Sequence, residues 1–114
     1  MKRANRQTAM DFIRDRVDFT ASSLSGRLGT YYGYGGRLGS ALRNRWRADN
    51  PVYAVYSYDT PIAWLPSGGG PWVMPTTKYS PTTTNHQTVA ARAVGEDVVW
   101  INNEGEEVEG RWVK

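Results

Sequence analysis

The segment VYAVYSYDTPIAWLPSGGGPWVM, residues 52–74, decides the fold of this 114-residue chain. Its first seven residues alternate two sets of side chains and are rich in aromatic and β-branched types, which predicts a strand. A second strand is expected over 62–65 and a third over 72–74, and the turn PSGGGP joins them as a hairpin. Trp64 and Trp72 flank this turn and are expected to be structural. The segment therefore predicts the centre of an antiparallel sheet.

Two helices are expected before this sheet. The first covers about Thr8 to Val17, with Thr8 as its N-cap and an apolar face. The segment FTASSLSG, which follows, is interpreted as an irregular or extended exit. The second helix covers Arg37 to Asp49, where leucine and tryptophan recur at helical spacing. A glycine-rich aromatic loop connects the two helices.

A third helix is expected from Thr84 to about Val94, with Gln87 at the capping-box position and Gly95 as its stop. A second hairpin follows over 98–113. The sequence thus predicts one α+β domain, residues 1–114, in which 95–114 form a C-terminal β-hairpin. Two N-terminal helices and one helix after the third strand pack on an antiparallel sheet of about five short strands.

Composition excludes several classes of protein. The chain has no cysteine and one histidine, which excludes disulfide scaffolds, thiolate metal sites and multi-histidine metal centres. We expect no metal and no cofactor. The longest uncharged window is interrupted by proline and glycine, so no membrane contact is expected and a cytoplasmic location is predicted.

The charge is unevenly distributed along the chain. Residues 1–50 carry ten basic and four acidic residues, whereas residues 51–114 carry four basic and seven acidic ones. A basic half favours an anionic partner, although solvated arginines on a helix surface explain the pattern equally well. The candidate nucleic-acid-binding residues are the arginines and loop tyrosines of this half: Arg37, Arg43, Arg45, Arg47, Tyr31 and Tyr34. The tyrosines have an alternative role in packing against the core.

Two stretches, VYSYDTPIAW at 55–64 and KYSPTTTNHQ at 78–87, resemble a small uncharacterised domain of phages and plasmids. FTASSLSG at 19–26 resembles the segment after that domain's first helix, so the resemblance covers about residues 8–94. It implies a mobile-element origin and no particular activity. The motif positions carried over onto this chain are Tyr56, Ser57, Tyr58, Thr60, Pro61, Tyr79, Ser80, Thr82, Thr83, His86 and Gln87.

The second motif places hydroxyl groups before a helix N-terminus, where free backbone N–H groups favour an anion. The candidate anion site comprises Tyr79, Ser80, Thr82, Thr83, His86 and Gln87. The alternative is structural, because caps and buried hydrogen bonds use the same residues. His86 is a weak candidate for acid–base catalysis, with Asp59 as the nearest carboxylate in the sequence. We expect a neutral imidazole at physiological pH.

Three functions follow from these residues, in decreasing order of support. The first is a small cytosolic protein that associates with nucleic acid through the arginine-rich helix and the hydroxyl-rich helix start. The second is a host-directed protein that binds a host cell protein through its aromatic side chains. The third is a metal-independent nuclease that uses His86. The expected partner is therefore a nucleic acid or a host protein, and the protein is not expected to be an enzyme.

Overall fold

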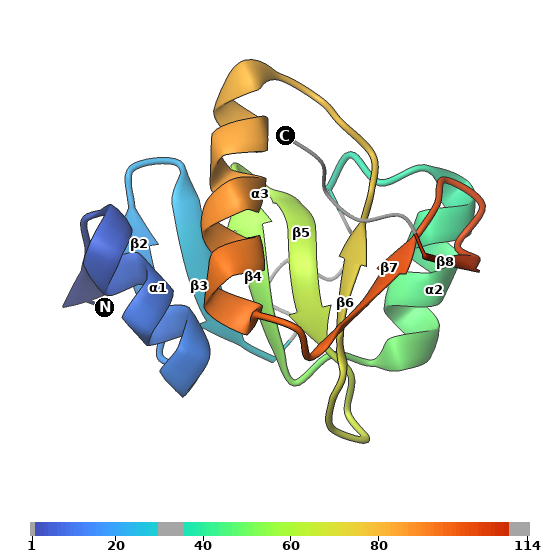
Figure 1. The fold of residues 1–114 in the computed structure, drawn as a ribbon, viewed down its shortest axis with the longest axis horizontal. Coiled ribbons are helices and arrows are strands. Elements are labelled where there is room, and N and C mark those ends of the chain that lie inside the picture. Colours follow the sequence, from blue (N-terminus) through green and yellow to red (C-terminus); the bar gives the residue numbers. More distant parts are fainter. Residues whose placement is uncertain (1, 30–35, 110–114) are drawn as a thin grey trace.

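The strands of the central sheet lie side by side in the order in which they occur in the chain (Figure 1). The computed structural model describes residues 2–29 and 36–109. Their elements are β1 (Lys2–Arg3), α1 (Arg6–Asp15), β2 (Phe19–Ala21), β3 (Leu24–Leu28), α2 (Ser40–Asp49), β4 (Tyr53–Ser57), β5 (Thr60–Leu65), β6 (Trp72–Pro75), α3 (Pro81–Val94), β7 (Val98–Ile101) and β8 (Glu107–Val108). The prediction of one α+β domain is confirmed, with more short strands than the five expected.

The sheet is mixed, so the prediction of a purely antiparallel sheet was wrong. The central strands β2 to β6 pair antiparallel, as do β7 and β8. However, β1 pairs parallel with β2 and β6 pairs parallel with β7. Helix α1 connects β1 to β2, and helix α3 connects β6 to β7. Each helix runs back along the sheet, so that the next strand starts at the same edge as the one before and runs in the same direction.

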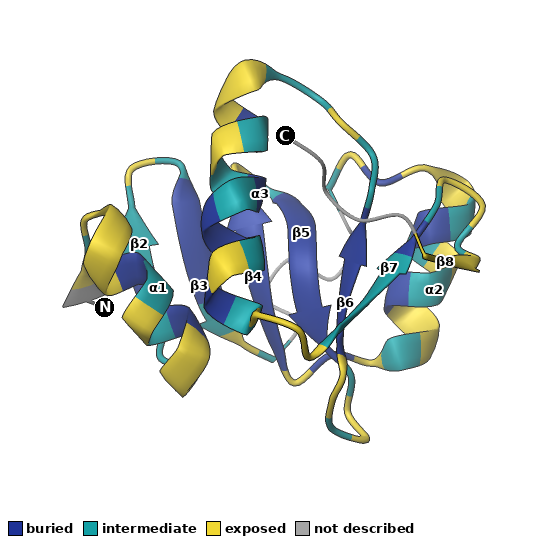
Figure 2. Ribbon diagram, viewed as in Figure 1, coloured by how far each residue is buried: buried dark blue, intermediate teal, exposed yellow. Residues whose placement is uncertain are grey.

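The helices cover both faces of the sheet. Figure 1 shows α1 and α3 on one face, and the buried side chains place α2 on the other. Strand β4 is buried throughout, as Figure 2 shows. Its alternate residues enter different cores: Tyr53 and Val55 face α1 and α3, whereas Ala54 and Tyr56 face α2. The period of two in the sequence therefore reflects a strand between two helical layers.

Only α1 is an N-terminal helix, because the segment after it is a β-hairpin rather than an irregular exit. Strands β2 and β3 pair antiparallel from Phe19↔Gly26 to Ala21↔Leu24. Strand β3 then pairs with β4, which makes the hairpin part of the central sheet. The second predicted helix, α2, thus follows two sheet strands. It begins at Ser40 and not at Arg37 as predicted, because Gly39 is extended and forms the N-cap.

The N-terminal ends of α1 and α3 also differ from prediction. Asn5 caps α1, and Thr8 lies inside it as the second member of the capping box. Ser80 caps α3, which begins at Pro81, and its hydroxyl accepts a hydrogen bond from the Thr83 N–H at 3.2 Å. The predicted start at Thr84 was wrong because Pro81 suits the first helical position and its ring fixes φ in the helical range. Gly95 ends the helix as expected, with φ 67°.

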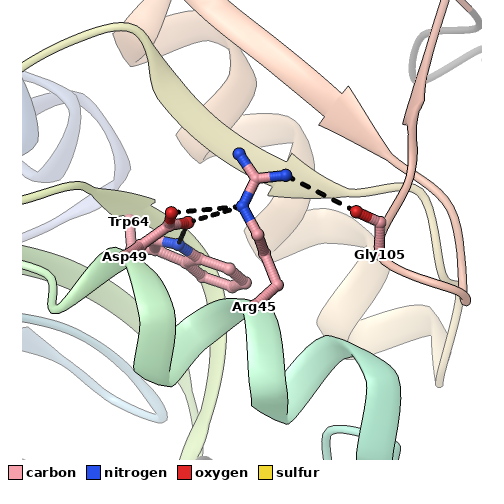
Figure 3. Close-up of polar contacts among 4 residues, drawn as sticks. All are labelled: Arg45, Asp49, Trp64 and Gly105. Carbon is pink, nitrogen blue, oxygen red and sulfur yellow. Dashed lines mark hydrogen bonds and ion pairs between the residues drawn. The ribbon is translucent and has the colours of Figure 1, made fainter.

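Helix α2 is fixed to the sheet by tryptophan and by an ion pair. The Trp46 ring meets Trp64 edge to face, with centroids 5.1 Å apart. Arg45 Nε donates to both carboxylate oxygens of Asp49, at 3.1 and 2.9 Å, and a second Arg45 nitrogen reaches the Gly105 carbonyl at 3.5 Å (Figure 3). These contacts tie α2 to β5 and to the β7–β8 turn.

The two tryptophans beside the glycine turn do not face each other. Trp64 lies opposite Val73 in the β5–β6 pair, so Trp64 points toward α2 and Trp72 toward the opposite core. Both rings are buried, as the expected structural role requires. Among the residues described, no helix has the length and apolar character needed to cross a membrane.

Candidate functional site

The two sequence motifs meet where the turn between β4 and β5 contacts the N-terminal end of α3. Ser57, the last residue of β4, lies with its Oγ 2.7 Å from His86 Nδ1 and 3.0 Å from Thr83 Oγ1. Thr83 Oγ1 also accepts a hydrogen bond from Ser80 Oγ at 3.2 Å. The motif residues therefore form one polar cluster, which joins the sheet to the first turns of α3.

The hydroxyl groups of this cluster can form one continuous chain of hydrogen bonds that ends at His86. Ser80 accepts the Thr83 N–H and donates its hydroxyl hydrogen to Thr83. If every hydroxyl hydrogen is used within the cluster, Thr83 donates to Ser57 and Ser57 donates to His86 Nδ1. The imidazole then carries its proton on Nε2. That nitrogen is not buried and has no partner among residues 2–29 and 36–109, so it is available as a donor to a ligand.

The surroundings of His86 favour the neutral ring. Partial burial of the imidazole lowers its pKa below the usual 6.5, and the nearby positive charge of Arg6 lowers the pKa further. The direction agrees with the expectation of a neutral ring. Arg6 is the first residue of α1, which packs beside α3.

Arg37 brings a second cation to the site from the segment before α2. Its backbone N–H donates to Thr60 Oγ1 at 2.9 Å, which attaches it to the start of β5. Its guanidinium carbon lies 5.9 Å from the centre of the Tyr79 ring, within cation–π range. Gly36 makes this approach possible, because a Cβ at that position would overlap the backbone of Asp59.

Burial raises the pKa of the Tyr79 hydroxyl, and the positive charge of Arg37 and a hydrogen bond from Thr77 partly oppose this effect. Tyr79 therefore remains a neutral phenol at physiological pH, with its ring beneath a guanidinium. The cluster thus presents cations from α1 and from the segment before α2, a neutral imidazole and a helix N-terminus.

Some motif residues lie outside this cluster. Tyr56 points to the α2 core, where its ring meets Trp46 at 6.1 Å, and Pro61 is buried in β5. Gln87 is buried and donates from Nε2 to the Thr77 carbonyl at 2.8 Å, so it orders the segment before α3 rather than capping the helix. Thr82 is exposed in the first turn of α3.

The arginines of α2 have different surroundings. Arg43 donates to the carbonyls of Gly36 and Leu38, at 3.0 and 2.9 Å, and Arg45 pairs with Asp49. Both guanidinium groups thus make contacts within the protein. Arg47 is exposed on the helix surface. Tyr31 and Tyr34 lie outside the described residues.

The geometry of the cluster suits binding better than acid–base chemistry. His86 hydrogen-bonds to Ser57 and not to a carboxylate among the residues described. Ser57 is only 2% exposed, so its hydroxyl is not accessible as a nucleophile. Within the described parts of the chain, no group of three or more histidine or acidic residues is arranged to hold a metal ion.

Sequence reasoning missed Arg6 as a residue of this site. Arg6 and His86 are 80 positions apart, and no periodicity relates them. Only the packing of α1 beside α3 brings the cation to the imidazole. A hollow elsewhere on the surface, lined by Val98, Trp100, Val108, Glu107 and Glu109 among others, lies at the acidic edge of the sheet and does not suit an anion.

The model of one protein family, described as a family of unknown function (DUF8033), matches residues 19–104. The match begins at β2 and ends in the turn after β7, so it includes both motif segments and the polar cluster that they form. No curated protein and no solved structure matches the chain. Because the family model spans well over half of the sequence, the chain belongs to the DUF8033 family of unknown function.

Proposed function

We propose that the protein binds nucleic acid by its phosphate groups at the N-terminal end of α3. The observation that supports this most is that positive charges lie on both sides of this helix end: Arg6 lies near His86, and Arg37 lies over the ring of Tyr79, which precedes the N-cap Ser80. The two arginines and α3 come from three separate segments of the chain. The positive charges of the arginines add to the field of a helix end that itself favours anions.

The donors of the site suit a phosphate group. His86 offers Nε2–H, Arg37 offers a guanidinium, and the first turn of α3 contributes the N–H of Thr82. Arginine and backbone N–H groups are the usual partners of nucleic-acid phosphates. Arg47 is exposed on α2 and remains part of the proposed surface. Arg43 and Arg45 are not included, because their guanidinium groups bind acceptors within the protein.

A mobile-element origin remains part of this proposal. It is supported by the resemblance of the two motif segments to a domain of phages and plasmids. The polar cluster gives these segments a common physical role, because their side chains contact each other directly.

Binding is tested by fluorescence anisotropy with labelled duplex and single-stranded DNA at two salt concentrations. We expect affinity for the wild-type protein to fall as salt rises, because bound phosphates release counterions. The variant Arg37→Glu should weaken binding and reduce the slope of log affinity against log salt by about one or more. Absence of binding to both probes at low salt would refute the proposal.

Arg92→Glu is the matched control. Arg92 is exposed in the last turn of α3, so this variant changes the net charge as Arg37→Glu does but at the opposite end of the helix. We expect Arg92→Glu to weaken binding less than Arg37→Glu. Equal losses for the two variants would show that net charge, and not the site around His86, determines affinity.

A further inference from the structure

Tyr58 occupies an unfavourable backbone conformation in the turn between β4 and β5. Its φ is +59°, in the left-handed region that glycine, asparagine or aspartate tolerate better than a bulky side chain. The Tyr58 N–H donates to the Ser23 carbonyl at 2.7 Å, which holds this turn against the turn between β2 and β3. The fold therefore keeps an aromatic residue at a position where it is locally costly.

Burial of the Tyr58 side chain does not offset this cost. It is 58% exposed, in contrast to Tyr53 and Tyr56 in the preceding strand β4, which are fully buried. Its ring lies beside the imidazole of His86, with centroids 6.4 Å apart and planes inclined by 54°. An exposed aromatic ring is thus held next to His86, the residue proposed to donate a hydrogen bond to a phosphate.

We propose that Tyr58 stacks on an unpaired base of a nucleic acid strand whose phosphate binds at His86 and Arg37, which makes the ligand single-stranded. This inference rests on the proposed function and specifies its substrate class. Stacking on an exposed aromatic ring requires a base whose face is free, and bases in a duplex are already stacked on their neighbours. The Tyr79 ring beneath Arg37 is not available in the same way, because it is partly buried.

The test compares a labelled oligothymidylate with a labelled duplex of the same length. Tyr58→Gly should weaken binding of the oligothymidylate about tenfold and leave binding of the duplex unchanged. The same variant should melt at a higher temperature, because glycine relaxes the left-handed backbone. Retained folding with lost affinity separates a ligand-binding role from a structural one.

Two further variants control the experiment. Tyr58→Phe keeps the ring and should retain the affinity of the wild-type protein for the oligothymidylate. Leu28→Ala removes another exposed apolar side chain, 60% exposed at the far end of β3, and should have no effect on either probe.

The outcomes distinguish this inference from the proposed function. If the wild-type protein binds neither probe, both fail. If it binds with the expected dependence on salt and Arg37, but Tyr58→Gly binds the oligothymidylate as tightly as the wild type, the stacking role alone is overturned. Equal losses for oligothymidylate and duplex would also overturn it.

Discussion

The carboxylate of Asp49, at the end of α2, accepts a hydrogen bond from the indole N–H of Trp64 in β5, at 2.8 Å (Figure 3). The same carboxylate is paired with Arg45, which lies one helical turn earlier. One side chain thus satisfies a buried indole donor and a partly buried cation, and it joins two elements of the fold. The positive charge of Arg45 is therefore paired with a carboxylate of the same protein.

We expect Asp49→Ala to lower the free energy of unfolding by about 2 kcal/mol, because it leaves the Trp64 N–H without an acceptor and Arg45 without its carboxylate partner. Asp49→Asn keeps an acceptor for Trp64 and should cost about half as much. Urea unfolding followed by tryptophan fluorescence measures both values. If Asp49→Ala were as stable as the wild type, the contact would be unimportant for stability.

Arg45 and Arg47 should respond differently to charge reversal. Arg45→Glu places a carboxylate beside Asp49 and should cost about 1–3 kcal/mol of stability. Arg47→Glu changes an exposed side chain and should cost about 0.5 kcal/mol, since it affects mainly the helix dipole. Thermal unfolding of the two variants checks this difference. Equal stability of the variants would contradict it.

His86 should make stability depend on pH in the acidic range. Its pKa is lowered in the folded protein, so between that pKa and the usual 6.5 the unfolded chain binds more protons than the folded one. The contribution of the neutral ring to the free energy of unfolding is therefore fully present above about pH 6.5. It decreases as the pH falls below that value. His86→Gln should show a smaller decline when unfolding is measured from pH 7 to pH 5. A wild-type pKa above 7, measured by NMR, would contradict this prediction.

Tyr53 should make the protein sensitive to alkali. Its hydroxyl donates to the Val17 carbonyl at 2.8 Å, and burial, together with the negative charge of Asp18, raises its pKa well above the usual 10. Above pH 10 the unfolded chain loses this proton while the folded protein keeps it, so stability falls as pH rises, by up to about 1.4 kcal/mol per pH unit. Tyr53→Phe lacks the ionisable group, so its slope of stability against pH above 10 should be shallower. Identical slopes for the two proteins would exclude Tyr53 as the cause.

Local sequence signals predicted the elements from α2 onward but missed the strands β1, β2 and β3, which precede it. The alternation over 52–58, the glycine turn over 66–71 and the leucine–tryptophan spacing of α2 correspond to β4, the β5–β6 hairpin and α2. They succeed because a strand repeats every two residues and a helix about every 3.6, so each pattern depends on near neighbours. The same signals misplaced the starts of α1 and α3, because Asn5 and Ser80 compete with Thr8 and Thr84 as caps.

The sequence by itself also predicted that the segment from Tyr79 to Gln87 carries the polar side chains of the candidate site. Only the tertiary structure decided that Ser57 contacts His86, that Arg6 reaches it from α1, and that Asp49 accepts a hydrogen bond from Trp64. These contacts join residues that are far apart in the chain. They depend on the parallel return of β7 after α3 and on the packing of helices against both faces of the sheet, which no local pattern specifies.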